Sequence, residues 1–218
     1  LGVSLAGSLV AVADGPAGLA VVDLADPVNA QIIHQIPLSS SARAVATAGP
    51  IAYVGLASGD LAVADLITGT VLQRINLGAA IQDVALIGDA LYALTIGRLY
   101  ALSLDGDEVM VEGSVAVPGG TGAGGRRLRL SAGLNRGYAS YTSGFNVVNL
   151  ADPFDPVHVF QNNTAQFGWK QLVPNGSGLA LAAVSPNSTD DGPHHISLYN
   201  LEPEGTSGQF ITTSVSAG

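Results

Sequence analysis

Five glycines recur at nearly constant intervals along this 218-residue chain. Each glycine follows a short apolar run and precedes a longer one, and the intervals between them are 42, 39, 45 and 43 residues. Self-similarity at a fixed period of this size predicts a repeat architecture, in which each repeat is one structural unit. The five glycines are Gly7, Gly49, Gly88, Gly133 and Gly176.

A second marker keeps register with the glycines. An apolar run that ends in Asp, Ser or Asn follows them after 16, 16, 15, 16 and 24 residues. In the third unit, four runs rich in Val, Leu, Ile and Tyr are separated by Gly and Asp turns, as antiparallel hairpins require. The sequence therefore predicts an all-β fold, a β-propeller of four-stranded antiparallel blades with five repeats visible. The second markers are Asp23, Asp65, Ser103, Asn149 and Asn200.

The repeat also predicts how the chain is divided. We expect one propeller domain with units at about residues 1–38, 39–77, 78–118, 119–162 and 163–214. Gly218 lies 42 residues after Gly176, so residues 215–218 are interpreted as the start of a sixth unit. Because the first unit has its own first strand, we expect this chain alone not to close the ring. Further blades would then lie on additional sequence or on another chain.

Composition excludes several classes of partner. Hydrophobic residues make up 47% of the chain and charged residues 11%, which suits a large buried core. Apolar runs fall well short of the roughly 20 residues of a spanning helix, so we expect no membrane insertion. The net charge of −9 disfavours nucleic acid and anionic lipid. Without cysteine, the chain has no disulfide framework and no thiol nucleophile.

Units 1 and 4 read VAVADGPAGLAVVDLADPVNAQIIHQI (10–36) and GYASYTSGFNVVNLADPFDPVHVFQ (137–161). Both resemble the LVIVD repeat of bacterial surface and secreted propellers. Unit 2, SGDLAVADLITGTVLQRINL, resembles a quinoprotein-type blade with Gln73 in place of the usual tryptophan. The resemblance implies a non-catalytic binding or scaffold module, secreted or at the cell surface, with protein or glycan partners. Without the tryptophans, it implies no quinone cofactor and no docking of tryptophans between blades.

One repeated position is enriched in basic residues. It lies six residues before each glycine, where the connection from the preceding unit enters the first strand. One hypothesis is a basic collar that binds a carboxylate or sulfate; the alternative is that polar residues simply start strands at a wet rim. The position holds Leu1, Arg43, Gln82, Arg127 and Lys170.

Two departures from the repeat fall on the same predicted face, in units 4 and 5. They are a glycine-rich connection at 118–126 and an insertion of about eight residues within 185–195. Departures from a repeat often carry function, so we expect a ligand site here. The glycine-rich segment lacks the Gly-Lys-Ser/Thr ending of a phosphate loop. A metal site in the insertion is a less favoured alternative. The insertion contributes Asp190, Asp191, His194 and His195 to the predicted ligand site.

Two functions remain in competition. The first is the non-catalytic module, for which we expect no catalytic residue, cofactor or metal ligand. The second is a propeller hydrolase or lyase that acts on sugars or lactones at the axial channel. Glycosidases need two or three carboxylates, whereas the predicted first strands offer only Asp83 as an acid. That count favours the module.

Overall fold

A computed structural model describes most of the chain and divides it into two compact units. Unit 1 comprises residues 1–95 and 102–112, and unit 2 comprises 96–101 and 113–218. Within the described residues, no helix is long and apolar enough to cross a membrane. The described residues are 2–106, 108–119, 126–131, 134–163, 169–175, 178–184, 194–201, 209–210 and 215–217.

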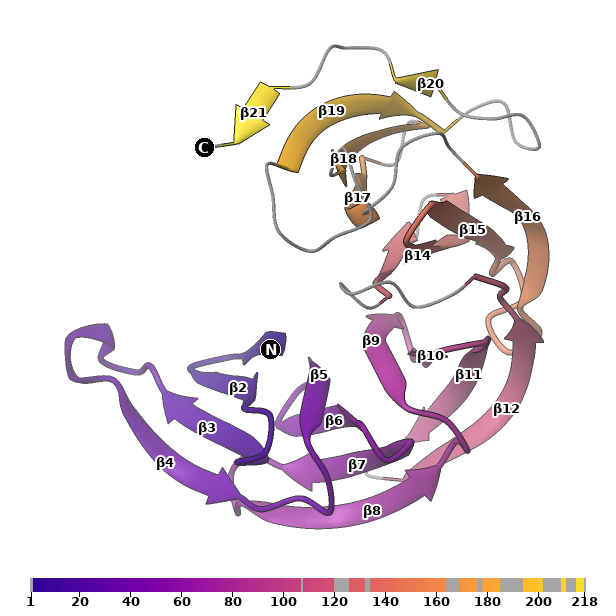
Figure 1. The fold of residues 1–218 in the computed structure, drawn as a ribbon. Helices are drawn as coiled ribbons and strands as arrows, with labels where there is room; N and C mark the ends of the chain where they lie inside the picture. Colours follow the sequence, from indigo (N-terminus) through magenta and orange to yellow (C-terminus); the bar gives the residue numbers. More distant parts are fainter. Residues whose placement is uncertain are drawn as a thin grey trace. The chain divides into compact units, whose positions relative to one another are not determined.

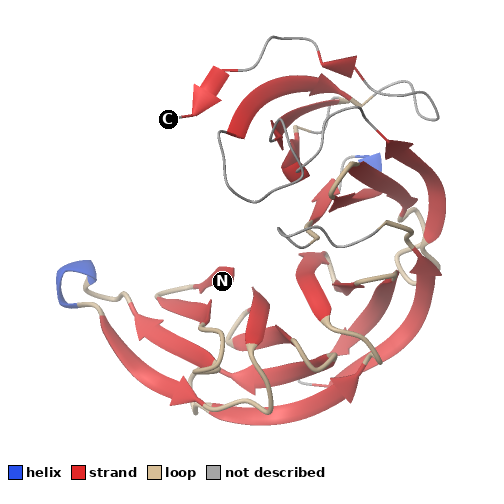
Figure 2. Cartoon of the chain, in the orientation of Figure 1, coloured by secondary structure: helices blue, strands red, loops and turns tan. Residues whose placement is uncertain are grey.

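Antiparallel sheets make up almost all of the described chain (Figures 1 and 2). In the first three sheets, strands that follow one another in the sequence are hydrogen-bonded neighbours. The first sheet holds β1 (Gly2–Ala6), β2 (Leu9–Ala13), β3 (Leu19–Asp23) and β4 (Gln31–Ile36), with a short 3-10 turn at Pro27–Asn29 before β4. The second holds β5 (Ala42–Ala48), β6 (Ile51–Leu56), β7 (Asp60–Asp65) and β8 (Thr70–Asn76). The third holds β9 (Ile81–Ile87), β10 (Ala90–Thr95), β11 (Arg98–Asp105) and β12 (Glu108–Ala116).

The fourth and fifth sheets repeat this order in unit 2. The predicted fold class, an all-β propeller of antiparallel blades, is therefore confirmed. The fourth sheet holds β13 (Leu128–Ser131), β14 (Arg136–Tyr141), β15 (Gly144–Asn149) and β16 (Val157–Asn163). The fifth holds β17 (Trp169–Pro174), β18 (Leu179–Val184), β19 (His194–Asn200), β20 (Gln209–Phe210) and β21 (Val215–Ala217).

The repeated glycines form the turns between first and second strands. Gly7, Gly49 and Gly88 have φ angles of 63°, 53° and 55°, in the left-handed region where a side chain is costly. Each lies in a turn between paired strands, which confirms the prediction of equivalent turns for these three. Gly133 and Gly176 lie outside the described residues, although β13 pairs with β14 and β17 with β18 around them.

In the first, second and fourth sheets, the second marker caps the turn that follows the third strand. The Oδ1 atom of Asp23 accepts from the backbone N–H two residues later at 2.8 Å, that of Asp65 at 2.7 Å and that of Asn149 at 3.0 Å. A side chain that satisfies turn donors in this way fixes the turn. In Asp65, hydrogen bonds from the backbone of Ile67 and Thr68 lower the carboxyl pKa below its ordinary value of 3.8.

In the first, second and fourth sheets, one position of the fourth strand contacts the neighbouring sheet or the core shared with it. In unit 1, the Gln73 amide on β8 donates to the Val109 carbonyl at 2.9 Å and accepts from the Val109 N–H at 2.8 Å. The registers place His34 of the first sheet and Phe160 of the fourth at the same position. His34 hydrogen-bonds the Ile67 carbonyl at 2.9 Å, and Phe160 packs against the core shared by the fourth and fifth sheets. Gln73 thus supplies a polar contact between the second and third sheets.

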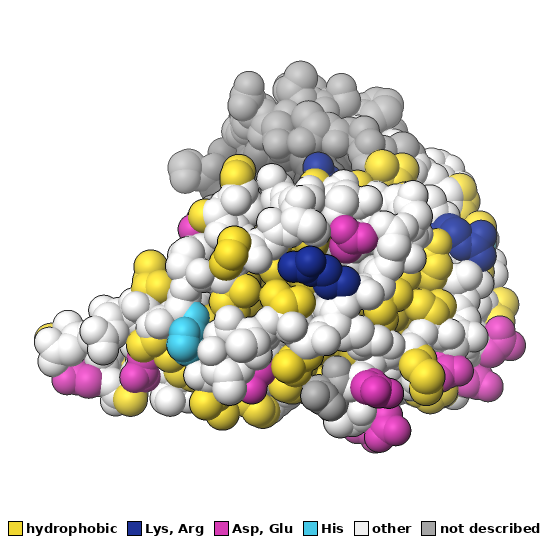
Figure 3. Space-filling model, turned by 90° about the horizontal axis from the view of Figure 1, so that it is seen from below, with side chains coloured by type: hydrophobic (Ala, Val, Ile, Leu, Met, Phe, Trp, Pro, Cys, Tyr) yellow, Lys and Arg dark blue, Asp and Glu magenta, His cyan; other side chains and the backbone are white. Residues whose placement is uncertain are grey.

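The fourth strands are also the sheet edges, and they carry exposed aliphatic residues. Figure 3 views the outer strands β4 and β8 from below, with hydrophobic side chains lying among polar and charged ones. A β-bulge interrupts the ladder at Ile33, Leu72 and Val159. Bulges twist an edge away from further strand pairing, so these edges are poor templates for another chain.

The last strand corrects the expectation of a sixth unit. β19 pairs with β18 along one edge, and with β20 and β21 along the other. Val215 lies opposite Ile196, and Ala217 opposite His194. Residues 215–217 are therefore a second piece of the outer strand of the fifth sheet. The sequence similarity to the start of another unit was misleading because a short Val-Ser-Ala run suits an inner or an outer strand equally.

Replacing Gln73 with Ala should leave both polar groups of the buried Val109 backbone without their partner. We expect the free energy of unfolding to fall by roughly 2 kcal/mol, since an unsatisfied buried group costs about 1–3 kcal/mol. Gln73→Glu should also destabilise, because a carboxylate cannot donate to the carbonyl. Urea unfolding and hydrogen exchange at the Val109 amide measure both effects. Gln31→Ala, on the exposed part of β4, is the control; an equal loss there would contradict the docking role.

Acid should destabilise the wild type more than Asp65→Asn. A carboxyl with a lowered pKa stabilises the fold above its unfolded pKa, and this contribution is lost as pH falls through the folded value. The asparagine should keep the cap without titrating, as Asn149 does in the fourth sheet. Melting temperatures from neutral pH down to about pH 2, the acid limit of such titrations, test this. Parallel curves for the two proteins would contradict it.

Candidate binding positions on the first strands

The predicted basic position is a β-bulge in three sheets. In the second sheet, Ala42 pairs with Leu56 and Ala44 with Gly55, so Arg43 is the extra residue. Gln82 is the extra residue in the third sheet, and Lys170 in the fifth. A bulge re-aims its extra side chain relative to the regular alternation of a strand. The sequence indicated that these positions are equivalent, but not that they are bulged.

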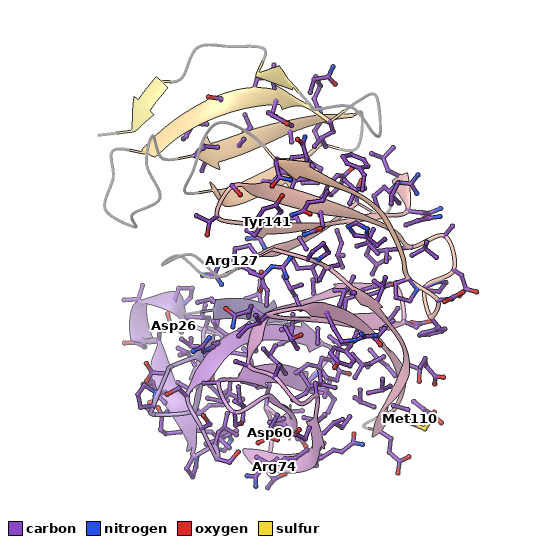
Figure 4. The ribbon with its side chains drawn as sticks, turned by 45° about the vertical axis from the view of Figure 1, so that its right-hand side comes forward. Asp26, Asp60, Arg74, Met110, Arg127 and Tyr141 are labelled. Carbon is purple, nitrogen blue, oxygen red and sulfur yellow. The ribbon has the colours of Figure 1, made fainter. Side chains whose placement is uncertain are left out.

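Arg127 occupies the corresponding place in the fourth sheet, immediately before β13. Its N–H donates to the Ser140 hydroxyl at 3.1 Å, and its carbonyl accepts from the Ser140 N–H at 2.9 Å. These bonds hold the backbone of Arg127 in the sheet while its side chain stays half-exposed (Figure 4). Among the described residues, no partner binds the guanidinium of Arg43 or Arg127. Within the described part of the chain, both guanidinium groups are therefore available to a ligand.

The structure brings these residues together as two pairs. In unit 1, β5 lies beside β9, so Arg43 and Gln82 are on neighbouring strands. In unit 2, β13 lies beside β17, so Arg127, which directly precedes β13, and Lys170 on β17 lie near the starts of neighbouring strands. Gln82 is buried, and its amide donates to the Ala80 carbonyl at 3.3 Å. That burial removes Gln82 from the accessible site. Arg43, Arg127 and the backbone position of Lys170 remain.

The predicted insertion site falls largely outside the described residues, which exclude Asp190 and Asp191. His194 and His195 begin β19, where His195 pairs with Val184 on one side and Ser216 on the other. Among the described residues, no group of three or more His, Cys, Asp or Glu side chains could hold a metal ion. The ligand role of these four residues stays a prediction.

Arg126 precedes Arg127 in the sequence but lies in a different environment, which the sequence analysis did not predict. It is fully buried. Its Nη1 donates to the Ile96 and Val117 carbonyls at 2.7 and 2.8 Å, and its Nε to the Ser140 carbonyl at 3.2 Å. Its Nη2 lies 3.4 Å from the Pro118 carbonyl oxygen. Desolvation lowers the pKa of Arg126 to about 10, so the buried guanidinium remains cationic at neutral pH.

Arg126 is therefore a structural cation, since its guanidinium donates hydrogen bonds to backbone carbonyls. It ties the turn at Ile96 and the connection at Val117 to β14, all within unit 2. The only hint in the sequence was that the two arginines occupy consecutive positions, which a β-strand turns to different environments.

A second buried polar group lies at the end of β16. The Nδ2 of Asn162 donates to the Tyr199 hydroxyl at 2.8 Å, and burial raises the pKa of that phenol to about 12. The Tyr141 hydroxyl lies 2.8 Å from the Asn162 carbonyl and from the Asn163 Oδ1. Asn162 begins an Asn-Asn-Thr sequon, but its buried amide is unavailable for glycosylation in the folded protein.

Asp83, the acid expected at the first strands, is also buried. Its Oδ1 accepts from the Val84 N–H at 3.1 Å. The described first strands bring no second carboxylate beside it, as a glycosidase pair would require.

No family model matches the sequence, and no curated protein matches it at a significant level. The computationally designed protein Ika8 aligns with a TM-score of 0.65 and 14% identity over 99% of this chain and 63% of its own. The β-propeller domain of Cps50 (Swd1) from Myceliophteria thermophila aligns at 0.62 and 11% over 89% of this chain and 62% of its own. The designed Ika4 aligns at 0.57 and 13% over 78% and 98%. The fold is thus a β-propeller, and this chain spans less than two thirds of Ika8 and of the Cps50 domain.

Arg126→Met should destabilise unit 2 strongly, because four carbonyl oxygens lose their donor. Hydrogen bonds to a charged group are worth about 1.5–3 kcal/mol each, and partial relaxation leaves an expected loss of roughly 3 kcal/mol. Thermal and urea unfolding measure it. Arg98→Met is the matched control, because it removes an exposed arginine of β11 that hydrogen-bonds Ser114. A loss no greater than that of the control would show that Arg126 is dispensable.

Proposed function

We propose that this chain is a non-catalytic β-propeller module that binds a protein or carbohydrate partner and acts as a scaffold. The propeller fold supports a binding or scaffold module in general terms. The resemblance of units 1 and 4 to the LVIVD repeat supports a secreted or cell-surface protein of a bacterium. The observation that carries the proposal is the basic position at the start of the first strands, with Arg127 and Lys170 near the starts of neighbouring strands of unit 2.

The ligand we propose for this position is anionic, with a carboxylate or sulfate group. The chain carries a net charge of −9, so its overall field repels such a ligand at long range. At physiological salt, charges are screened beyond roughly 8 Å. Local cations can then bind an acidic group that reaches them, and a contact of this kind is short-ranged. An acidic glycan or an acidic peptide segment fits this description.

The alternative, a propeller hydrolase or lyase, is less well supported. Its best feature would be Asp83 on a first strand. The described first strands offer Asp83 no partner carboxylate, which a pair of glycosidase carboxyl groups would require. If the protein cleaves a sugar or lactone and this activity survives Asp83→Asn, Asp83 is not the catalytic acid.

Removing both charges, with Arg127→Gln and Lys170→Gln, should weaken binding of acidic glycans or peptides on an array by at least about tenfold, or 1.4 kcal/mol. The melting temperature should hardly change, because Arg127 is held by its backbone. Arg74→Gln with Arg98→Gln removes the same charge from exposed strands elsewhere and is the control. Full retention of binding by the first double variant would reject the site. Unfolding of that variant would show that the two residues are structural.

A further inference from the structure

Arg129 follows Arg127 by two residues, on the first strand of the fourth sheet. Burial alternates along this segment. Arg126 and Leu128 are buried, with 0% and 1% of their surface exposed, whereas Arg127 and Arg129 are half-exposed. Successive side chains of a strand point to opposite faces of its sheet. Arg127 and Arg129 therefore share one face, and the two buried residues share the other.

Pairing with β14 shows that the chain is already extended at Arg127. Leu128 pairs with Ala139, and the next pair in this register is Arg127 with Ser140. The Ser140 N–H donates to the Arg127 carbonyl at 2.9 Å, and the Arg127 N–H donates to the Ser140 hydroxyl at 3.1 Å. The Cα atoms of Arg127 and Arg129 are thus about 7 Å apart, the length that two residues of a strand span.

The face that carries the two arginines is turned toward the fifth sheet. Tyr138 pairs with Arg129, so the two side chains lie on the same face of the fourth sheet. Tyr138 belongs to the core that the fourth sheet forms with Leu172 and other residues of the fifth. β13 also lies beside β17, the strand that contains Lys170. Arg129 therefore lies on the same side of β13 as the proposed anionic site.

A hydrogen bond holds the guanidinium of Arg129 close to Arg127. Its Nη1 donates at 2.7 Å to the carbonyl of Leu128, the residue between the two arginines. The carbonyl is uncharged, so this bond fixes the position of the guanidinium without neutralising it. Both guanidinium groups are cationic at neutral pH, and like charges this close repel each other. A ligand with two acidic groups would offset both charges.

We infer that Arg129 is a further binding residue of the proposed anionic site, and that the ligand is an extended peptide segment with Asp or Glu at alternate positions. Side chains two residues apart in an extended peptide lie on one side, about 7 Å apart. β13 gives Arg127 and Arg129 the same repeat. Each carboxylate can then accept a charge-assisted, bidentate hydrogen bond from one guanidinium. This inference rests on the proposed function, to which it adds a binding residue and the spacing of the acidic groups.

Three capped pentapeptides test the spacing in NMR titrations at low salt. They are Ser-Glu-Ser-Glu-Ser, its isomer Ser-Glu-Glu-Ser-Ser, and Ser-Glu-Ser-Ser-Ser with a single glutamate. The first should bind the wild-type chain at least about tenfold more tightly than the other two, since a second charge-assisted bond is gained. In the isomer, adjacent glutamates point to opposite sides of the extended chain, although its charge is the same.

Arg129→Gln should reduce the affinity for Ser-Glu-Ser-Glu-Ser to that of the single-glutamate peptide, whose own affinity should hardly change. Arg98→Gln removes the same charge from an exposed position on β11 and is the matched control. In the wild type, the Arg129 Nε–H resonance should shift on addition of Ser-Glu-Ser-Glu-Ser. This measurement tests the residue even if Arg129→Gln does not fold, and an unshifted resonance would overturn the assignment.

The outcomes separate this inference from the proposed function. Equal affinity of the wild type for the two isomeric peptides would overturn the alternate spacing. Binding that Arg127→Gln abolishes and Arg129→Gln leaves intact would reject Arg129 alone, and the proposed anionic site would stand. The same holds if an acidic glycan binds through Arg127 while none of the peptides binds. If neither acidic peptides nor acidic glycans bind the wild type, the proposed anionic site itself fails.

Discussion

Face-to-face packing of apolar sheets is the interaction on which this protein depends. The shared core of the first two sheets is built largely from alanine and valine, whose small side chains let two sheets approach closely. Gly55 shows how tight the approach becomes, since a Cβ at that position would lie 2.5 Å from the Ile81 side chain of the next sheet. A blade has two such faces and cannot bury both by itself. Stability therefore comes from the stacking of neighbouring blades.

Polar side chains complete this packing where backbone groups would otherwise be left unpaired. Gln73 hydrogen-bonds both the N–H and the carbonyl of Val109 on the next outer strand. Arg126 donates to carbonyls of a turn, a connection and a strand. Each polar contact satisfies groups that are costly to bury alone. Glutamine, histidine and phenylalanine occupy one equivalent position of the fourth strand in three different sheets, with different contacts in each.

The proposed binding position also follows from how the first strands pack. Bulges at the start of the first strands set three side chains outside the regular alternation that packing requires. The residue at this position differs between blades: it is Arg43, which is exposed, in the second sheet, Gln82, which is buried, in the third, and Lys170 in the fifth. A repeat architecture can thus vary its ligand position without disturbing its cores. The solved propellers with 11–14% identity to this chain share the fold and leave the ligand open.

The sequence alone determined the repeat, the four-stranded blades and the turns, because glycines with positive φ and turn-capping Asp or Asn act locally. It also placed Arg43, Gln82, Arg127 and Lys170 at one equivalent position. Only the tertiary structure decided which cation is buried, since the carbonyls that bind Arg126 come from segments up to 30 residues away. It likewise assigned residues 215–217 to the fifth sheet, because strand pairing between distant segments depends on which edge is vacant and leaves no signature in a short apolar run.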